Sequence, residues 1–218
     1  MLMRSLCAAT LLLFAGHALA AAPQKWVAGK NYTVLEPAQP TPDPDKVEVV
    51  EVFSYGCPHC KDFVPFADKI REALPPQAVF HTLPAALGHS AWATFARGYY
   101  AARALGVAHE AHDALFKAVF EKQTISPISP TLADLAKFYA GYGVKPDVFT
   151  ATANSFGVNA AIKRGNERIK GFGVTGTPTI VVNGKYRLDV ASAGGFGQTV
   201  ELVHYLVAKE VAELKAGQ

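Results

Sequence analysis

Residues 53–61 read Phe53-Ser54-Tyr55-Gly56-Cys57-Pro58-His59-Cys60-Lys61. This stretch has the form of a strand end that leads into a Cys-x-x-Cys turn, and we expect the turn to open a helix. Cys57 would then lie at the N-terminal end of that helix, with Cys60 one turn further in. We interpret the rest of the chain as the scaffold that positions these two sulfur atoms.

The segments on either side of the cysteines predict a β-strand, a helix and a second β-strand. Residues 47–54 are apolar and β-branched apart from two glutamates, which suits a central strand covered on both faces. Residues 62–74 carry apolar side chains at helical spacing, with a kink expected at Pro65, and residues 78–83 form the next strand. This order predicts a βαβ unit whose first loop carries the cysteine pair.

The middle of the chain, residues 88–173, shows only helical patterns. Five short helices are predicted in it, at residues 91–105, 108–122, 131–140, from 145 onward and 158–170. Because strand patterns return after it, we interpret this segment as a helical insertion between the second and third main strands.

The C-terminal part predicts a β-hairpin and a closing helix. Asn183-Gly184 separates two strand patterns, and these two residues tolerate the positive φ angles of a type I′ turn. Residues 197–214 are apolar on one face and should pack back on the sheet, while residues 31–35 suit a short edge strand. The sequence therefore predicts an α/β fold, a central mixed β-sheet flanked by helices, with an inserted all-helical subdomain.

The composition and the N-terminus indicate a folded, exported protein. Half of the 218 residues are hydrophobic, and the 21 basic and 18 acidic residues form no basic run that would indicate nucleic acid or an anionic membrane surface. A positive charge within residues 1–4, an apolar run at 6–14 and the pattern Ala18-Leu19-Ala20 predict a signal peptide cleaved after Ala20. The alternative is a membrane anchor, but the apolar run is shorter than the roughly 20 residues an anchor needs.

Export determines how the cysteines are interpreted. Removal of residues 1–20 takes Cys7 with it and leaves Cys57 and Cys60 as the only thiols. A structural disulfide that closes so short a loop removes little chain entropy, and a structural zinc site needs a second ligand pair that the sequence lacks. In an oxidising compartment, the lone Cys-x-x-Cys therefore indicates a reactive pair without a metal.

Several segments together resemble the thioredoxin-fold disulfide oxidoreductases, and closely the bacterial DsbA family: residues 53–60, the helical insertion, Gly176-Thr177-Pro178 and residues 182–186. Pro58-His59 between the cysteines is typical of that family. The resemblance implies a thioredoxin fold interrupted by helices, a periplasmic location and reoxidation by a quinone-linked membrane protein of the DsbB type.

The expected parts are a signal peptide (1–20), the N-terminal part of the thioredoxin fold with the cysteine pair (21–87), the helical insertion (88–173) and the C-terminal part with the cis-proline loop (174–218). We expect a monomer that needs no cofactor beyond the redox-active Cys57–Cys60 disulfide and binds no nucleic acid. Its substrates would be reduced, unfolded exported proteins.

Elementary chemistry assigns different roles to the residues of the motif. At a helix N-terminus the Cys57 thiolate is stabilised, which lowers its pKa, and His59 can add a donor or a positive charge beside it. Pro58 removes an N–H and restricts the loop, while the less exposed Cys60 acts as the resolving partner. A substrate thiolate would attack Cys57, form a mixed disulfide and leave oxidised.

Two further sites follow from the resemblance. Gly176-Thr177-Pro178 resembles the cis-proline loop that faces the disulfide and binds an extended substrate segment, although relatives often carry an apolar residue where Thr177 stands. Glu51 matches a buried acidic residue that assists proton transfer at the second cysteine. The lysine that usually accompanies it is missing, since residues 79–83 offer only His81, and the alternative is a glutamate that reaches solvent at a sheet edge.

Other functions share the same motif. A disulfide reductase or isomerase would carry the same cysteine turn, but isomerases of this type have an N-terminal dimerisation module for which residues 21–46 are too short. A non-catalytic thioredoxin-fold chaperone or binding module is disfavoured because both cysteines are intact.

Overall fold

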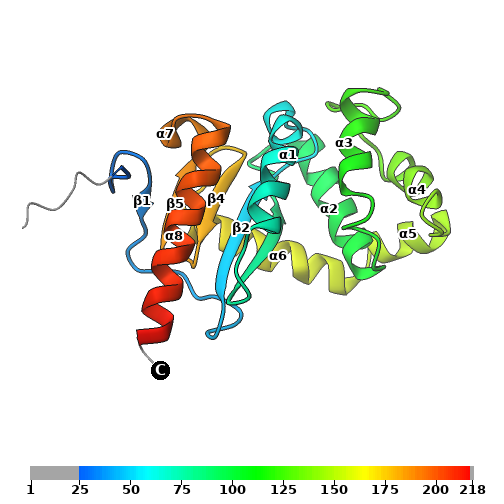
Figure 1. Ribbon diagram of the computed structural model, residues 1–218. Helices are drawn as coiled ribbons and strands as arrows, with labels where there is room; N and C mark the ends of the chain where they lie inside the picture. The colour runs from blue at the N-terminus through cyan, green and yellow to red at the C-terminus, as the bar shows by residue number, and fades with distance from the viewer. Residues whose placement is uncertain (1–24, 217–218) are drawn as a thin grey trace, which may run out of the picture.

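The computed structural model describes residues 25–216, so the expected signal peptide and its cleavage after Ala20 lie outside the described residues. A five-stranded sheet with the order β1-β5-β4-β2-β3 forms its centre (Figure 1). The strands are β1 Thr33–Val34, β2 Val47–Phe53, β3 Ala78–Pro84, β4 Thr179–Val182 and β5 Tyr186–Asp189. β2 and β3 are parallel, and the other neighbours are antiparallel, which makes the sheet mixed.

The strand before the cysteines is central, as predicted. β2 lies between β3 and β4, and all seven of its residues are buried. Side chains of a strand alternate between the two faces of a sheet, so a strand buried throughout must be covered on both. β2 therefore ends at Phe53 inside the molecule, and the cysteine turn begins a few residues later.

Helices cover the two faces of the sheet. On one face, α1 (Pro58–Glu72) and α8 (Phe196–Ala216) pack their apolar side chains against Val47 and Val49. On the other face, the end of α6 (Phe156–Gly171) packs against Val50 and Val52. This two-sided packing confirms the thioredoxin-like architecture and the expectation that the last helix returns to the sheet.

Most of the helical insertion stands to one side of the sheet in Figure 1, and its last helix, α6, runs from there back to the sheet. The insertion comprises α2 (Ser90–Ala104), α3 (His112–Phe120), α4 (Leu132–Ala140), α5 (Pro146–Ala153) and α6, which all lie between β3 and β4 in the chain. The short helix α7 (Val190–Ala193) directly after β5 was not predicted. Its four residues are too few to show a helical period.

One predicted helix, residues 108–122, is shorter than expected. The chain makes a turn at 108–111, where the His112 N–H binds the His109 carbonyl three residues back, before α3 begins. At the other end Gln123 adopts a φ of 52°, and the Thr124 N–H closes on the Ala118 carbonyl at 2.9 Å. This left-handed residue and the bond that follows it end the helix, and apolar periodicity does not reveal them.

The hairpin between β4 and β5 has the predicted turn. Asn183 and Gly184 have φ angles of 51° and 63°, both positive as a type I′ turn requires. A Cβ at position 184 would lie 2.0 Å from the backbone oxygen of Gln39. Glycine is therefore required there for space as well as for conformation.

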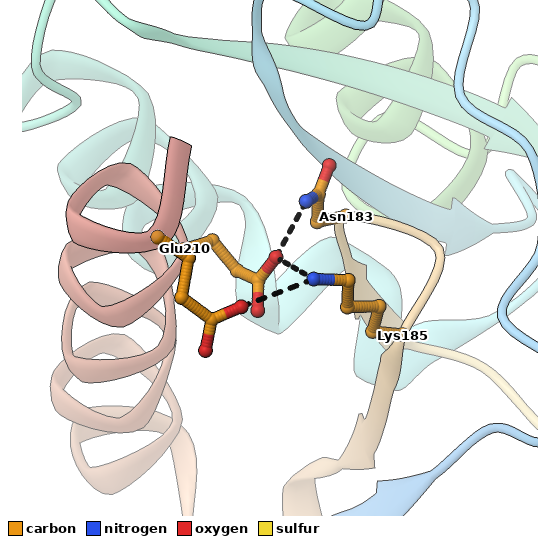
Figure 2. Close-up of polar contacts among 4 residues, drawn as sticks. Asn183, Lys185 and Glu210 are labelled. Atoms are coloured by element: carbon orange, nitrogen blue, oxygen red, sulfur yellow. Dashed lines mark hydrogen bonds and ion pairs between the residues drawn. The ribbon is translucent and has the colours of Figure 1, made fainter. Parts of the chain in front are cut away.

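A buried carboxylate fastens this hairpin to α8, as Figure 2 shows. Glu210 is only 1% exposed, and its Oε2 accepts hydrogen bonds from Asn183 Nδ2 at 2.6 Å and from Lys185 Nζ at 2.7 Å. Lys185 also pairs with Glu213 at 3.2 Å. Burial raises the pKa of Glu210, but the bonds from Lys185 and Asn183 outweigh burial and hold it below its ordinary value.

Replacing Lys185 with methionine is expected to lower the free energy of unfolding by about 1–3 kcal/mol near neutral pH, because it leaves a buried carboxylate short of a partner. The Glu210 pKa is lowered in the fold, so this contribution is present above the ordinary value of 4.5 and lost as the pH falls through the folded value. Urea unfolding near neutral pH and in acid measures both effects. Lys215→Met, an exposed lysine of α8, is the control; an equal loss there would show that the ion pair at Glu210 contributes nothing.

Among residues 25–216, no helix combines the length and hydrophobicity that crossing a membrane requires.

Candidate active site

The two cysteines lie where the sequence placed them. Cys57 is the N-cap residue of α1, in an extended conformation, and Pro58 is the first helical residue, a position where the missing N–H of proline costs nothing. Both cysteines are free thiols in this structure. Cys60 is fully buried and Cys57 is 4% exposed, so an incoming thiolate can reach only Cys57.

The environment of Cys57 favours its thiolate and lowers its pKa to about 6. The largest cause is the hydrogen bond from the Cys60 thiol; burial opposes it, and bonds from Thr177 and from the backbone N–H groups of Cys60 and His59 support it. These N–H groups belong to the first helical turn, where the backbone donors have no carbonyl four residues back. The exposed His59 imidazole is not among these causes, so its influence on the sulfur stays a prediction.

The environment of Cys60 favours its protonated thiol. Burial raises the pKa of Cys60 far above its ordinary value, and the hydrogen bond to Cys57 and the negative charges of Cys57 and Glu51 raise it further. At neutral pH the reduced site therefore holds one thiolate and one thiol. This asymmetry makes Cys57 the better leaving group of the pair.

The predicted loop faces the cysteines. The Thr177–Pro178 peptide bond is cis, as expected, and the Cys57 thiol donates to the Thr177 carbonyl oxygen at 3.4 Å. The carbonyl of Gly176 accepts a bond from the Thr179 hydroxyl at 2.8 Å, which fixes the loop before β4. A cavity of about 730 Å³ opens beside it, lined by His59, Gly176, Thr177 and Pro178 among others.

The departure at Thr177 has a structural consequence. Its hydroxyl is buried and makes no hydrogen bond of ordinary geometry among residues 25–216, but it lies close enough to both sulfur atoms to lower the pKa values of both cysteines. A hydroxyl in this position can donate to the Cys57 thiolate, which an apolar side chain cannot.

The isosteric change Thr177→Val is therefore expected to raise the pKa of Cys57 above its present value of about 6, by roughly half a unit to one unit. The ultraviolet absorbance of the thiolate, followed as reduced protein is titrated, measures this pKa. Thr175→Val changes an exposed threonine of the same loop and serves as the control. An unchanged pKa in Thr177→Val would show that this hydroxyl does not act on the sulfur.

Glu51 lies in the centre of the sheet, so the alternative of a solvent-exposed glutamate at a sheet edge is wrong. It pairs with Thr82 on β3 and with Ile180 on β4, and it is 2% exposed. Burial raises the pKa of its carboxyl to about 8, although the positive charge of Arg71 opposes this shift. One carboxylate oxygen has no hydrogen-bond partner in the described part of the chain. Glu51 thus holds a proton near neutral pH. The charge of the Cys57 thiolate raises the pKa of Glu51, and the charge of Glu51 in turn raises the pKa of Cys60.

The charge that opposes burial at Glu51 lies in another element than the sequence indicates. Residues 79–83 of the neighbouring strand offer only His81, whereas the opposing charge comes from Arg71 near the end of α1. Arg71 also bonds to Asp68 and stacks over Phe80. No pattern in the sequence connects this arginine to β2.

A second contact that the sequence did not reveal joins the insertion to the residues before Cys57. The Tyr55 hydroxyl and His112 Nδ1 form a buried hydrogen bond of 2.9 Å. Burial lowers the pKa of His112 to about 3, with Arg71 and His109 lowering it further, so the imidazole is neutral. The first residue of α3 thereby fixes the position of the residue two before the reactive thiol.

Where the structure describes the chain, no group of three or more potential metal-ligating side chains gathers. A low-pKa thiol beside a buried, protonated one, facing a cis-proline loop on this sheet, is an arrangement for thiol–disulfide exchange. The fold and the site together define a thioredoxin-fold disulfide oxidoreductase.

Comparison with known proteins leads to the family. Residues 77–200 match the DSBA-like thioredoxin domain. The thiol:disulfide interchange protein DsbA of Pseudomonas aeruginosa is 38% identical over 216 residues, covering 98% of this chain and 100% of that protein. DsbA of Pseudomonas syringae pv. tomato is 39% identical over 94% of both chains. The chain belongs to the DsbA family of thiol:disulfide interchange proteins.

Solved structures of DsbA proteins are similar to this one over most of the chain. The crystal structure of Pseudomonas aeruginosa DsbA has a TM-score of 0.80 at 39% identity and covers 87% of this chain and 97% of its own. The crystal structure of the oxidoreductase DsbA from Xylella fastidiosa has a TM-score of 0.81 at 37% identity, over 85% of this chain and 98% of its own.

Proposed function

We propose that this protein is an exported disulfide oxidase that donates its Cys57–Cys60 disulfide to newly exported, reduced and unfolded proteins. The observation that carries the proposal is the opposite pKa shift of the two thiols, with Cys57 lowered to about 6 and Cys60 raised. Stabilising the thiolate stabilises the reduced protein relative to the disulfide. A disulfide whose reduced form is stabilised is a strong oxidant of other thiols.

The exchange proceeds in two displacements. A substrate thiolate attacks the Cys57 sulfur, the Cys57–Cys60 bond breaks, and Cys60 leaves with the electron pair. Its raised pKa requires a proton, which the protonated Glu51 carboxyl supplies. A second substrate thiolate then attacks the substrate sulfur of the mixed disulfide and expels the Cys57 thiolate. The substrate loses two electrons, which the protein holds as a thiolate and a thiol.

Substrate would bind along residues 176–178. The cavity of about 730 Å³ beside this loop has room for a side chain of an extended segment, and Thr177 holds the segment close to Cys57. His59 lines this cavity and Pro58 next to it is exposed, so both are placed to contact the incoming chain.

The cell context of this activity follows from the N-terminal pattern and the family. The pattern ending at Ala20 directs the chain to the periplasm, and the mature protein, acting as a monomer, would comprise the parts 21–87, 88–173 and 174–218. The Cys57–Cys60 disulfide is the only redox group required. Each turnover leaves the protein reduced, so a DsbB-like, quinone-linked membrane oxidase must accept its electrons.

The test is the equilibrium of the purified protein with glutathione buffers of known ratio, following the Cys57–Cys60 bond by alkylation of free thiols. We expect even slightly reducing buffer to reduce the bond. A bond that resists until the buffer is strongly reducing would overturn the proposal and indicate a reductase. Denatured protein, in which both thiols have ordinary reactivity, calibrates the alkylation.

A further inference from the structure

A second cavity, of about 540 Å³, lies between α2 and α6, away from the cysteines. Three arginines line it, Arg103 from α2 and Arg164 and Arg168 from α6, and none of its lining residues is acidic. It shares no lining residue with the cavity beside Thr177. A cavity of this size accommodates a small ligand, and its charge selects an anion.

One of the three arginines, Arg168, is held in place by an ion pair with the sheet. Arg168 donates to Glu48 Oε2 at 2.6 Å, and Glu48 is a β2 residue that is only 2% exposed. This pair balances the charge of Arg168 and holds its guanidinium against the cavity. Arg103 and Arg164 form no ion pair with any residue in 25–216, so the cavity keeps an excess positive charge.

A tyrosine side chain lines the same space. Tyr100 is 6% exposed and lines the cavity, yet its hydroxyl makes no hydrogen bond within the described part of the chain. It fits because residue 165 is glycine, where a Cβ would lie 2.0 Å from the hydroxyl oxygen. Burial raises the pKa of Tyr100 to about 12, while the arginines Arg103, Arg168 and Arg164 all act to lower it. The hydroxyl is therefore a protonated, unused donor within the field of three guanidinium groups.

The N-terminus of α6 supplies further donors. Ser155, Gly157 and Val158 line the cavity, and the Ser155 hydroxyl accepts from the Val158 N–H at 3.2 Å. The N–H groups of the first helical residues before Val158 have no partner inside the helix. They and the helix dipole favour a negative group at this end of the cavity.

We propose that this cavity binds a tetrahedral oxyanion, the phosphate ion or the phosphoryl group of a small phosphate ester, held mainly by Arg103 and Arg164. Guanidinium groups bind phosphate oxygens through parallel hydrogen bonds, and Tyr100 and the start of α6 add donors from other directions. A carboxylate offers fewer acceptor oxygens to donors that come from several sides. This site goes beyond disulfide exchange and involves none of its residues.

Isothermal titration calorimetry with inorganic phosphate and with glycerol phosphate, at constant ionic strength set by chloride, tests the proposal. The double variant Arg103→Ala and Arg164→Ala should weaken binding by about tenfold or more, since two charge-assisted bonds are lost. The matched control Lys163→Ala and Lys170→Ala removes the same charge from exposed positions of α6 outside the cavity, and should change binding less than about twofold. Tyr100→Phe removes only the hydroxyl and should weaken binding by a few-fold.

Two outcomes would overturn the site: no saturable binding of either ligand to the unaltered protein, or an equal loss in the lysine control, which would indicate diffuse attraction. Tighter binding of glycerol phosphate identifies an organic phosphate as the ligand, and tighter binding of phosphate identifies the free ion; both support the site. Thermal unfolding verifies that each variant is folded. Should the double variant unfold, Arg164→Ala alone carries the same test, and unweakened binding there would also count against the site.

Discussion

Cys57→Ser is expected to reduce disulfide transfer to a dithiol substrate to the uncatalysed background. The remaining Cys60 is fully buried and its pKa is raised, so it offers neither an accessible sulfur nor a thiolate. The rate at which a reduced, unfolded protein acquires disulfides, with glutathione disulfide as the terminal oxidant, measures the loss. Unchanged transfer by Cys57→Ser would favour the non-catalytic binding module over an enzyme.

Cys60→Ser is the matched variant, because it removes the other sulfur and has a different expected result. Its Cys57 thiolate still attacks a disulfide-bonded protein, but no Cys60 thiol remains to resolve the mixed disulfide that forms. Covalent complexes should therefore persist on non-reducing gels and disappear with a reductant. Equal amounts of complex in the two serine variants would contradict the division of roles between the cysteines.

Glu51→Gln is expected to stabilise the reduced protein while it slows the reaction. The carboxyl has a folded pKa of about 8 and an ordinary value of 4.5, so near neutral pH the fold must hold protonated a group that is ionised in the unfolded chain. The cost to the folded state at pH 7 is on the order of 3 kcal/mol. Glutamine cannot ionise in either state, so the variant avoids this cost.

The pH dependence identifies the cause. A raised folded pKa gives stability that is fully present below 4.5 and is lost as the pH rises toward about 8. Urea unfolding of reduced protein should therefore show a gain for Glu51→Gln near pH 7 and little difference near pH 4. A gain that does not change with pH would show that titration of Glu51 is not its source.

The kinetic half of this prediction concerns Cys60. Without a proton donor, departure of the Cys60 sulfur should slow by about tenfold to a hundredfold, measured as the rate at which a substrate thiol opens the Cys57–Cys60 disulfide. Glu48→Gln is the control, since Glu48 is equally buried on the same strand but pairs with Arg168 on the opposite face. The Glu48→Gln variant should be less stable than the unaltered protein, but a substrate thiol should open its disulfide at the unaltered rate. An unchanged rate in Glu51→Gln would remove Glu51 from the proton pathway.

The features that the sequence predicted well are those with local causes. The largely apolar, β-branched run of β2 and the turn at Asn183-Gly184 are each specified by neighbouring residues, and the position of Cys57 at the start of α1 follows from Pro58. Backbone preference and side-chain periodicity act within a few residues, so these features can be predicted from short stretches of sequence.

The features that the sequence did not reveal depend on contacts between distant segments. The charge opposite Glu51 comes from Arg71, and Tyr55 bonds to His112 from another helix. The ends of α3 are set by the turn at residues 108–111 and by the left-handed Gln123 rather than by its own apolar pattern. Only the folded arrangement brings these groups together, and one sequence carries no record of such pairings.

The contact between Tyr55 and His112 limits how this scaffold can be re-engineered. The Tyr55 ring packs 4.9 Å from Phe116 of α3, and Phe53, Tyr55 and Cys60 belong to the same hydrophobic cluster as the side chains of α2 to α5. Excising the helices to obtain a minimal thioredoxin would therefore expose the apolar side chains at the end of the strand that leads to the reactive thiol. The helical segment is part of the hydrophobic core around the redox centre, so a shortened design must supply other apolar side chains in its place.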